Sequence, residues 1–125
     1  MNAKVLVVDD SSLARRLVRS LLEEAGHSVE EATDGASALE RYFINRHDVV
    51  FLDMVMTGMY GLDVLAKLRE LNPDVRVIVA TADIQTSTRE QVRAAGAAAF
   101  VNKPLNRAVV KNVMSQVLKG EFQWS

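Results

Sequence analysis

Five short apolar runs, each followed by a helical pattern, constrain the fold of this chain more than any other feature. The runs span residues 5–8, 29–32, 49–52, 75–80 and 98–101. They are rich in valine and flanked by polar residues or glycine, which is typical of strands buried on both faces of a parallel sheet. The second run contains two acids and is expected near a sheet edge. The sequence therefore predicts five strands separated by helices.

Helical periodicity fills the segments between the runs. We expect a first helix that is capped by Ser11 or Ser12 and ends at Gly26, a second that begins after Asp34, and a third that stops at Asn72. A fourth is expected over residues 86–95 and a fifth over 106–119. The apolar positions that carry this periodicity are Leu13, Leu17, Leu21, Leu22, Ala36, Leu39, Phe43, Leu62, Leu65, Leu68, Val109, Val110, Val113 and Val117.

Alternation of strand and helix predicts an α/β fold, with a doubly wound five-stranded parallel sheet and helices on both faces. At 125 residues, the chain is expected to form a single domain over residues 1–125, with a core of about 4–119 and a tail of 120–125. The tail carries Phe122 and Trp124, which either fold back on the domain or contact a partner.

Composition excludes several classes of function. Fifteen Lys and Arg against sixteen Asp and Glu give a net charge of −1, which provides no general positive field for nucleic acid or an anionic membrane. Zero cysteines exclude disulfides and thiolate chemistry. No apolar run is long enough to cross a membrane, and no signal peptide is recognisable. We expect a cytoplasmic protein.

Polar residues follow four of the five runs directly. Asp9 and Asp10 follow the first, Asp53 the third, Thr81 the fourth, and Lys103 lies just beyond the fifth. In a parallel sheet these ends share one edge, where ligands of doubly wound folds bind. Alone, each residue has an ordinary explanation as a helix cap, a turn residue or a solvated lysine. Their coincidence favours a functional site.

The residue types at this edge suit one chemistry. Three carboxylates can hold a hard divalent cation, for which Mg²⁺ is the best candidate, with Mn²⁺ expected to substitute. A hydroxyl and an ammonium group suit the oxygens of a phosphoryl group. Without a cation, the carboxylates would repel one another and raise at least one pKa.

These residues resemble the receiver domain of two-component response regulators. The matching segments are Val5–Asp10, Phe51–Met56, Gly58–Gly61, Ala80–Ala82, Gly96–Ala97 and Lys103–Pro104. The resemblance covers nearly the whole chain and implies a flavodoxin-like fold with strand order 2-1-3-4-5. It also implies a cis peptide bond before Pro104, although X-Pro bonds are usually trans.

The resemblance implies that Asp53 accepts a phosphoryl group from a phosphohistidine on a sensor histidine kinase or a histidine phosphotransfer protein. Asp10 and Asp53 would bind Mg²⁺ directly, Asp9 largely through water, and Val55 through its carbonyl. Lys103 would neutralise phosphoryl charge, while backbone N–H groups near Met54 and Ala82 would bind its oxygens. The domain would catalyse its own phosphorylation and dephosphorylation without being an enzyme for other substrates.

The family also implies a switch. Thr81 would move toward the phosphoryl group and Phe100 would turn inward, although Phe100 is equally well explained as simple core. The change would reshape the surface of the fourth helix, fifth strand and fifth helix for a target protein or a fused output domain. Val55 and Asp83 flank the expected path of the hydrolytic water; because Val55 is apolar, only Asp83 could orient that water.

Departures from the family pattern are confined to one loop. Thr57 stands where the family often has proline and Tyr60 where it often has an acid, which affects loop stiffness and partner choice but not the phosphoryl chemistry. His27 and His47 stand apart from the site and are interpreted as surface residues.

Three other functions share part of this pattern. A phosphatase with an aspartyl-phosphate intermediate lacks its second acid, because that position is Val55. A flavin carrier is disfavoured because two acids replace the phosphate loop. An interaction module that acts without phosphorylation remains the main alternative. The sequence does not identify the stimulus, kinase or target. It also leaves open whether the chain acts alone or belongs to a longer regulator, and whether the expected monomer dimerises once phosphorylated.

Overall fold

The computed structural model describes residues 2–56, 59–82 and 86–124. Its main sheet contains five parallel strands in the order β2-β1-β3-β6-β7, which is the order 2-1-3-4-5 for the five predicted strands. The strands are β1 (Lys4–Val8), β2 (Ser28–Ala32), β3 (Val49–Asp53), β6 (Val77–Thr81) and β7 (Ala99–Asn102). The prediction of a doubly wound α/β fold is therefore confirmed.

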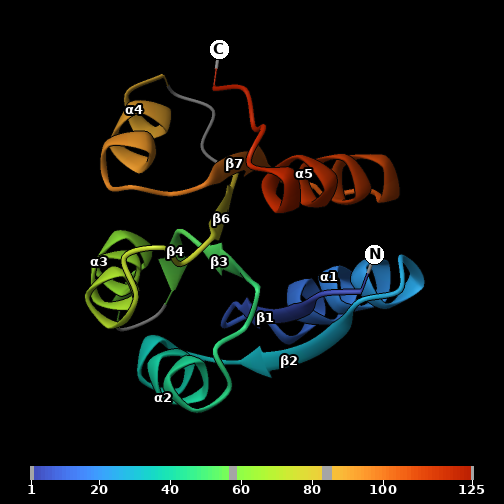
Figure 1. Ribbon diagram of the computed structural model, residues 1–125, viewed down its shortest axis with the longest axis horizontal. Helices are drawn as coiled ribbons and strands as arrows, with labels where there is room; N and C mark the ends of the chain where they lie inside the picture. Colours follow the sequence, from blue (N-terminus) through green and yellow to red (C-terminus); the bar gives the residue numbers. More distant parts are fainter. Residues whose placement is uncertain (1, 57–58, 83–85, 125) are drawn as a thin grey trace.

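Five helices cover the two faces of this sheet. Helices α1 (Ser12–Glu24) and α5 (Arg107–Lys119) lie on one face, and α2 (Gly35–Asn45), α3 (Gly61–Leu71) and α4 (Thr86–Ala94) lie on the other (Figure 1). Three helices begin at an N-cap residue. The side chains of Ser11, Asp34 and Asn106 each accept a hydrogen bond from a backbone N–H in the first turn of α1, α2 and α5. The predicted boundaries agree with the observed ones to within a few residues.

Strand residues alternate between two hydrophobic clusters, one on each face. Leu6 and Val8 of β1 pack toward α2 and α3, whereas Val5 and Val7 pack toward α1 and α5. The same alternation holds in β3 and β6, and it makes both faces apolar, as valine-rich strands require. This double burial explains why the runs that form β1, β3 and β6 lack a polar face, whereas β2 at the sheet edge carries two glutamates.

The fourth strand begins later than the sequence suggested. It was expected from Val75, but the N–H of Val75 donates to the carbonyl of Asn72 at 3.0 Å and so closes a turn after α3. The strand starts at Val77 and runs through Thr81. As a result, the predicted site residue Thr81 is the last residue of the strand rather than the first after it.

Two helices turn a different face inward than their spacing indicated. Leu13 and Leu17 of α1 are 77% and 48% exposed, whereas Val18, which was not predicted, is buried together with the predicted Leu22. In α2, Phe43 is exposed and Tyr42 is buried. Both helices contain two overlapping apolar stripes, and the direction of the sheet decides which stripe is covered.

Both histidines are buried, which contradicts the interpretation as surface residues. His27 Nδ1 accepts a hydrogen bond from the N–H of Ala3 at 3.1 Å. His47 Nε2 lies 2.7 Å from Glu30 Oε1, and its ring stacks on Tyr42. Their partners come from distant parts of the chain, so no local pattern indicated this burial.

A short antiparallel pair, β4 (Val55–Met56) and β5 (Met59–Tyr60), follows β3 and was not predicted. Thr57 and Gly58 lie outside the described residues. The pair brings the chain back so that α3 begins at Gly61, directly beside the end of β3. The N–H of Gly61 donates to the carbonyl of Met54 at 2.7 Å.

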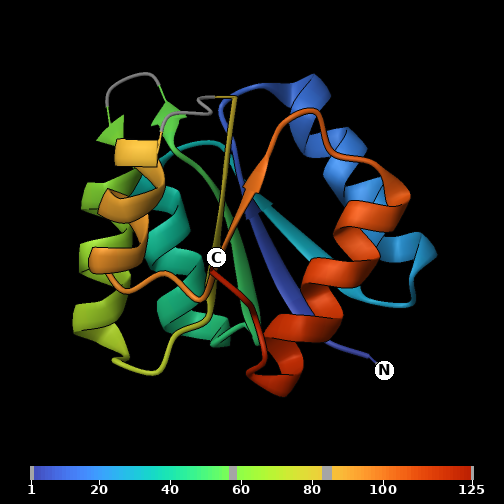
Figure 2. The same cartoon turned by 90° about the horizontal axis from the view of Figure 1, so that it is seen from above.

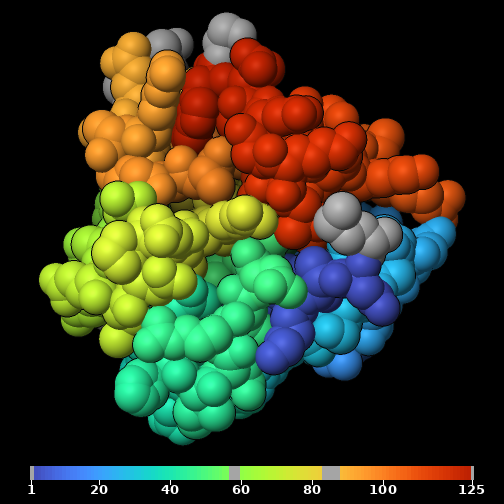
Figure 3. All heavy atoms as spheres, viewed as in Figure 1, coloured from blue at the N-terminus to red at the C-terminus, as the bar shows by residue number. Residues whose placement is uncertain are grey.

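The C-terminal tail packs back on the domain, as one of its two interpretations predicted. Phe122 and Trp124 are partly buried against opposite clusters, and their rings meet edge to face at 5.2 Å. The guanidinium of Arg93 in α4 lies 5.8 Å from the Trp124 ring. Figure 3 shows the tail, in deep red, against α4 in orange.

Candidate functional site

The carboxyl ends of the strands meet at one edge of the molecule, the upper edge in Figure 2. Asp53 and Thr81 are the last residues of β3 and β6. Asp9 follows β1 directly, and Lys103 follows β7. The hydrogen bond from Lys103 to Asp9 and the ion pair between Lys103 and Asp53 join three of these strand ends.

Three carboxylates form a cluster at this edge. One carboxylate oxygen from each of Asp9, Asp10 and Asp53 lies within 4.8 Å of the others. Asp9 is buried, Asp53 is half-buried and Asp10 is exposed, so the cluster is open to solvent on the side of Asp10. Carboxylate oxygens at this spacing are the donor set that Mg²⁺ prefers, and the residues present fit such a cation.

Lys103 lies between two of the carboxylates. Its Nζ donates to Asp9 Oδ2 at 3.0 Å and lies 3.2 Å from Asp53 Oδ1. Burial by itself lowers the pKa of Lys103, but the hydrogen bond to Asp9 and the attraction of both carboxylates raise the pKa above its usual value. Lys103 therefore stays protonated at neutral pH. The peptide bond between Lys103 and Pro104 is cis, as the resemblance implied.

The pKa of Asp53 is shifted by its surroundings in the cluster. Burial, followed by the negative charge of Asp9, raises the pKa of Asp53 above the usual value of an aspartate. Lys103 and the backbone N–H of Val55 act in the opposite direction without cancelling the effect. A half-buried carboxylate beside a like charge is an electrostatic cost that a bound cation would relieve.

Asp9 is held at both of its carboxylate oxygens. Oδ1 accepts from the N–H of Ser11 at 2.9 Å, and Oδ2 accepts from Lys103. The N–H of Asp9 donates to the carbonyl of Ala32 at 3.2 Å, which extends the pairing of β1 with β2 by one residue. Asp9 is thus held in position at the end of β1, with its carboxylate beside that of Asp53.

The two backbone N–H groups that follow Asp53 have different partners. The N–H of Met54 donates to the carbonyl of Ala80 at 3.2 Å, so the sheet already uses it. The N–H that reaches the Asp53 carboxylate is that of Val55. The contact of the Val55 N–H with Asp53 is one that sequence reasoning missed, because it depends on the register at the end of β3. Ala82 is exposed just after β6, and Asp83 lies outside the described residues.

The two predicted switch residues are both buried. Thr81 is 4% exposed, and its carbonyl accepts from the N–H of Lys103 at 2.8 Å. Phe100 in β7 is 7% exposed and belongs to the cluster under α2, α3 and α4. Phe100 therefore already lies inward in this structure.

Several known proteins are similar to this chain in sequence. The family model described as the response regulator receiver domain matches residues 5–115. The chemotaxis protein CheY of Thermotoga maritima is 32% identical over 95% of this chain and 100% of its own length. Sporulation initiation phosphotransferase F of Bacillus subtilis is 29% identical over 94% of this chain and 95% of its own length.

Solved structures agree with this assignment. Vibrio cholerae CheY4 has a TM-score of 0.88 and 30% identity, covering 94% of this chain and 99% of that chain. The chain belongs to the response regulator receiver domain family, and it is a phosphorelay signalling domain of the two-component type. Among the described residues, no helix has the length and apolar character needed to span a membrane.

Proposed function

We propose that the chain is one receiver domain that accepts a phosphoryl group on Asp53 from the phosphohistidine of a sensor histidine kinase or a histidine phosphotransfer protein. The observation that carries this proposal is the position of the Asp53 carboxylate, 3.2 Å from the Lys103 ammonium and within the three-carboxylate cluster. Asp9 also contacts this ammonium group, but its side chain is more deeply buried than that of Asp53, and its two oxygens already accept from Ser11 and Lys103.

In the proposed reaction, a carboxylate oxygen of ionised Asp53 forms a bond to phosphorus while the bond from phosphorus to the donor imidazole nitrogen breaks. The electron pair of the broken bond stays on the imidazole, and Asp53 becomes an acyl phosphate. Lys103 would place its positive charge beside the transferring oxygens, and backbone N–H groups near Met54, including that of Val55, and near Ala82 would donate to them. Asp53 must be deprotonated to act.

Asp9, Asp10, Asp53 and the carbonyl of Val55 would hold Mg²⁺, or Mn²⁺ in its place. When bound, the cation neutralises charge on the phosphoryl oxygens and helps to orient them. The raised pKa of Asp53 supports this assignment, since a nearby cation would favour the ionised carboxylate that the reaction requires.

Loss of the phosphoryl group by hydrolysis would set the lifetime of the signal. The Val55 side chain is 67% exposed beside Asp53 and has no polar atom to orient water. Asp83 would then be the side chain that orients the attacking water. A hydrolysis rate unaffected by Asp83→Ala would refute this role.

Phosphorylation would be transmitted through Thr81 and Phe100 to the surface of α4, β7 and α5, where a target protein or a fused output domain would bind. Because Phe100 is already inward, the change would consist of movement of Thr81 and repacking of α4 rather than rotation of the aromatic ring. The domain would act in the cytoplasm as a monomer that can dimerise once phosphorylated. It would bind neither nucleic acid nor membrane directly.

The test is intact-mass measurement after incubation with acetyl phosphate, with and without Mg²⁺. Wild-type protein should gain the mass of one phosphoryl group only with Mg²⁺, and Asp53→Asn should gain none. Asp63→Asn, the same change at an exposed position of α3, is the matched control and should be modified normally.

If neither acetyl phosphate nor a phosphorylated histidine donor modifies the wild-type protein, the proposal fails. The alternative, a receiver-like interaction module that acts without phosphorylation, would then replace it.

A further inference from the structure

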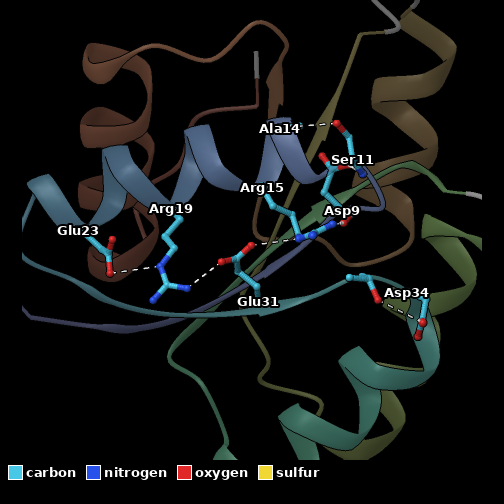
Figure 4. A network of polar contacts seen from close by, with 9 residues as sticks. Asp9, Ser11, Ala14, Arg15, Arg19, Glu23, Glu31 and Asp34 are labelled. Atoms are coloured by element: carbon cyan, nitrogen blue, oxygen red, sulfur yellow. Dashed lines mark hydrogen bonds and ion pairs between the residues drawn. The ribbon is translucent and has the colours of Figure 1, made fainter.

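Arg15 connects the first helix to the peptide group between two carboxylates of the site. Its Nη1 donates to the main-chain carbonyl of Asp9 at 2.6 Å, and its Nε donates to Glu31 Oε1 at 3.1 Å (Figure 4). The Arg15 side chain is only 13% exposed. A nearly buried guanidinium that reaches the backbone of a site residue is more than a surface ion pair.

Glu31 of β2 holds this guanidinium in place. Its second oxygen, Oε2, accepts from Arg19 Nη1 at 2.7 Å, and Arg19 Nε in turn donates to Glu23 at 3.3 Å. The hydrogen bond from Arg19, and a weaker one from Arg15, lower the pKa of Glu31 despite its partial burial. Glu31 therefore stays ionised, and the position of Arg15 is fixed from both α1 and β2.

We propose that Arg15 is a positioning residue that fixes the peptide group between Asp9 and Asp10, so that both carboxylates face Asp53. The inference rests on the proposed function of this edge. The side chain, N–H and carbonyl of Asp9 are each held by a separate partner, and Arg15 supplies the one at the carbonyl. Rotation of that peptide group would move Asp10, which lies directly beyond it in the chain.

The geometry requires an arginine. One planar guanidinium donates in two directions at once, from Nη1 to the backbone and from Nε to Glu31. A lysine carries the same charge but ends in a single ammonium nitrogen, which cannot reproduce the two separated donors. Arg15→Lys should therefore lose the positioning effect while it keeps the charge.

Charge alone would give the opposite result. Arg15 is a positive group near an acidic cation site, so its removal should strengthen binding of a divalent cation if only the electric field mattered. If Arg15 positions the peptide group, its removal should weaken binding. The sign of the change therefore separates the two explanations.

The experiment is calorimetric titration of the intact protein with Mg²⁺, together with thermal midpoints, for wild type, Arg15→Ala, Arg15→Lys and Arg19→Ala. Mutation of a residue that holds a metal ligand in position typically weakens metal binding by about tenfold or more. We expect Arg15→Ala and Arg15→Lys to weaken Mg²⁺ binding by about tenfold. Arg19→Ala, which removes a neighbour in the same network without touching Asp9, should leave the affinity near that of wild type.

Two outcomes would overturn the inference. One is unchanged or tighter Mg²⁺ binding by the Arg15 variants. The other is equal weakening by Arg19→Ala, which would mean that the network only stabilises the fold. If Arg15→Ala does not fold, Arg15→Lys decides alone. Failure of the wild-type protein itself to bind Mg²⁺ would refute the proposed cation site and the inference with it.

Discussion

Gly61 packs directly against the main chain of Asp53. A Cβ atom at position 61 would lie 2.6 Å from the Asp53 carbonyl oxygen and 2.7 Å from the Met54 Cα atom. Both neighbours are backbone atoms, which cannot move aside as a flexible side chain can. The first residue of α3 must therefore be glycine for β3 to end where it does.

Gly61→Ala should displace the end of β3 and impair phosphorylation. We expect a loss of about 1–3 kcal/mol in unfolding free energy, as for other overpacked sites, and slower phosphorylation by acetyl phosphate. Gly120→Ala is the control, because its φ of +71° makes alanine strained there although nothing lies within 4 Å. That variant should lose stability but keep its phosphorylation rate. Equal phosphorylation rates for both variants would contradict the prediction.

Asp53→Asn should make the cation-free protein more stable at neutral pH. Burial and Asp9 raise the pKa of Asp53, so its ionised form is less favourable in the folded than in the unfolded state. The stability that protonated Asp53 contributes is complete below its pKa in the unfolded state. It is lost as the pH rises from that value through the raised pKa of the folded state. Thermal midpoints in chelator at pH 4 and pH 7 should show this loss in wild type and a smaller one in Asp53→Asn.

Addition of Mg²⁺ should reverse the order of these two proteins. The cation stabilises the state that binds it, so the wild-type midpoint should rise by more than that of Asp53→Asn, which lacks one ligand charge. Asp63→Asn should behave like wild type throughout. Equal Mg²⁺ responses in all three proteins would place the cation away from Asp53.

His27 should make the fold sensitive to mild acid. Burial lowers the pKa of His27, and its Nδ1 already accepts a hydrogen bond from Ala3, which protonation would remove. The stability contributed by neutral His27 is complete above the ordinary histidine pKa and declines as pH falls below it. One titrating group such as His27 can change the unfolding free energy by at most about 1.4 kcal/mol for each pH unit. The unfolding free energy, measured by denaturant between pH 7.5 and 5, should depend less on pH in His27→Asn than in wild type.

Removal of the tail should destabilise the domain. Deletion of residues 122–125 removes the edge-to-face ring pair and the contact of Trp124 with Arg93. We expect a loss of about 1–2 kcal/mol, measured as a lower thermal midpoint. Gln123→Ala, at an exposed tail position, should have no effect. An unchanged midpoint in the deletion variant would favour the tail as a partner contact instead.

Local patterns were sufficient to predict the five strands of the main sheet and the edge that carries the site. Valine-rich runs of four to six residues are typical of strands with two buried faces, and parallel strands place Asp9, Asp53 and Lys103 at one edge. The contacts of Lys103 with both acids follow from that topology. These conclusions needed only the period of the pattern and the direction of the strands.

Features set by distant partners were not predictable from local patterns. Leu17 and Val18 are adjacent and equally apolar, and only the position of α1 on the sheet decides which is buried. His47 is buried because Glu30 and Tyr42 reach it from β2 and α2. The contact of the Val55 N–H with Asp53 depends on the register at the end of β3. A shift of one residue would exchange the partners of the Met54 and Val55 N–H groups.

The hydrogen bond between Lys103 and Asp9 joins residues 94 positions apart in the chain. During synthesis, a chain that has passed Asp53 already contains all three carboxylates but lacks the ammonium group that contacts Asp9 and Asp53. We expect such a chain to be a poor phosphoryl acceptor, because the site is complete only after β7 has joined the sheet and placed Lys103 beside Asp9 and Asp53. Chains that end before Lys103 should then compete poorly for a phosphoryl donor.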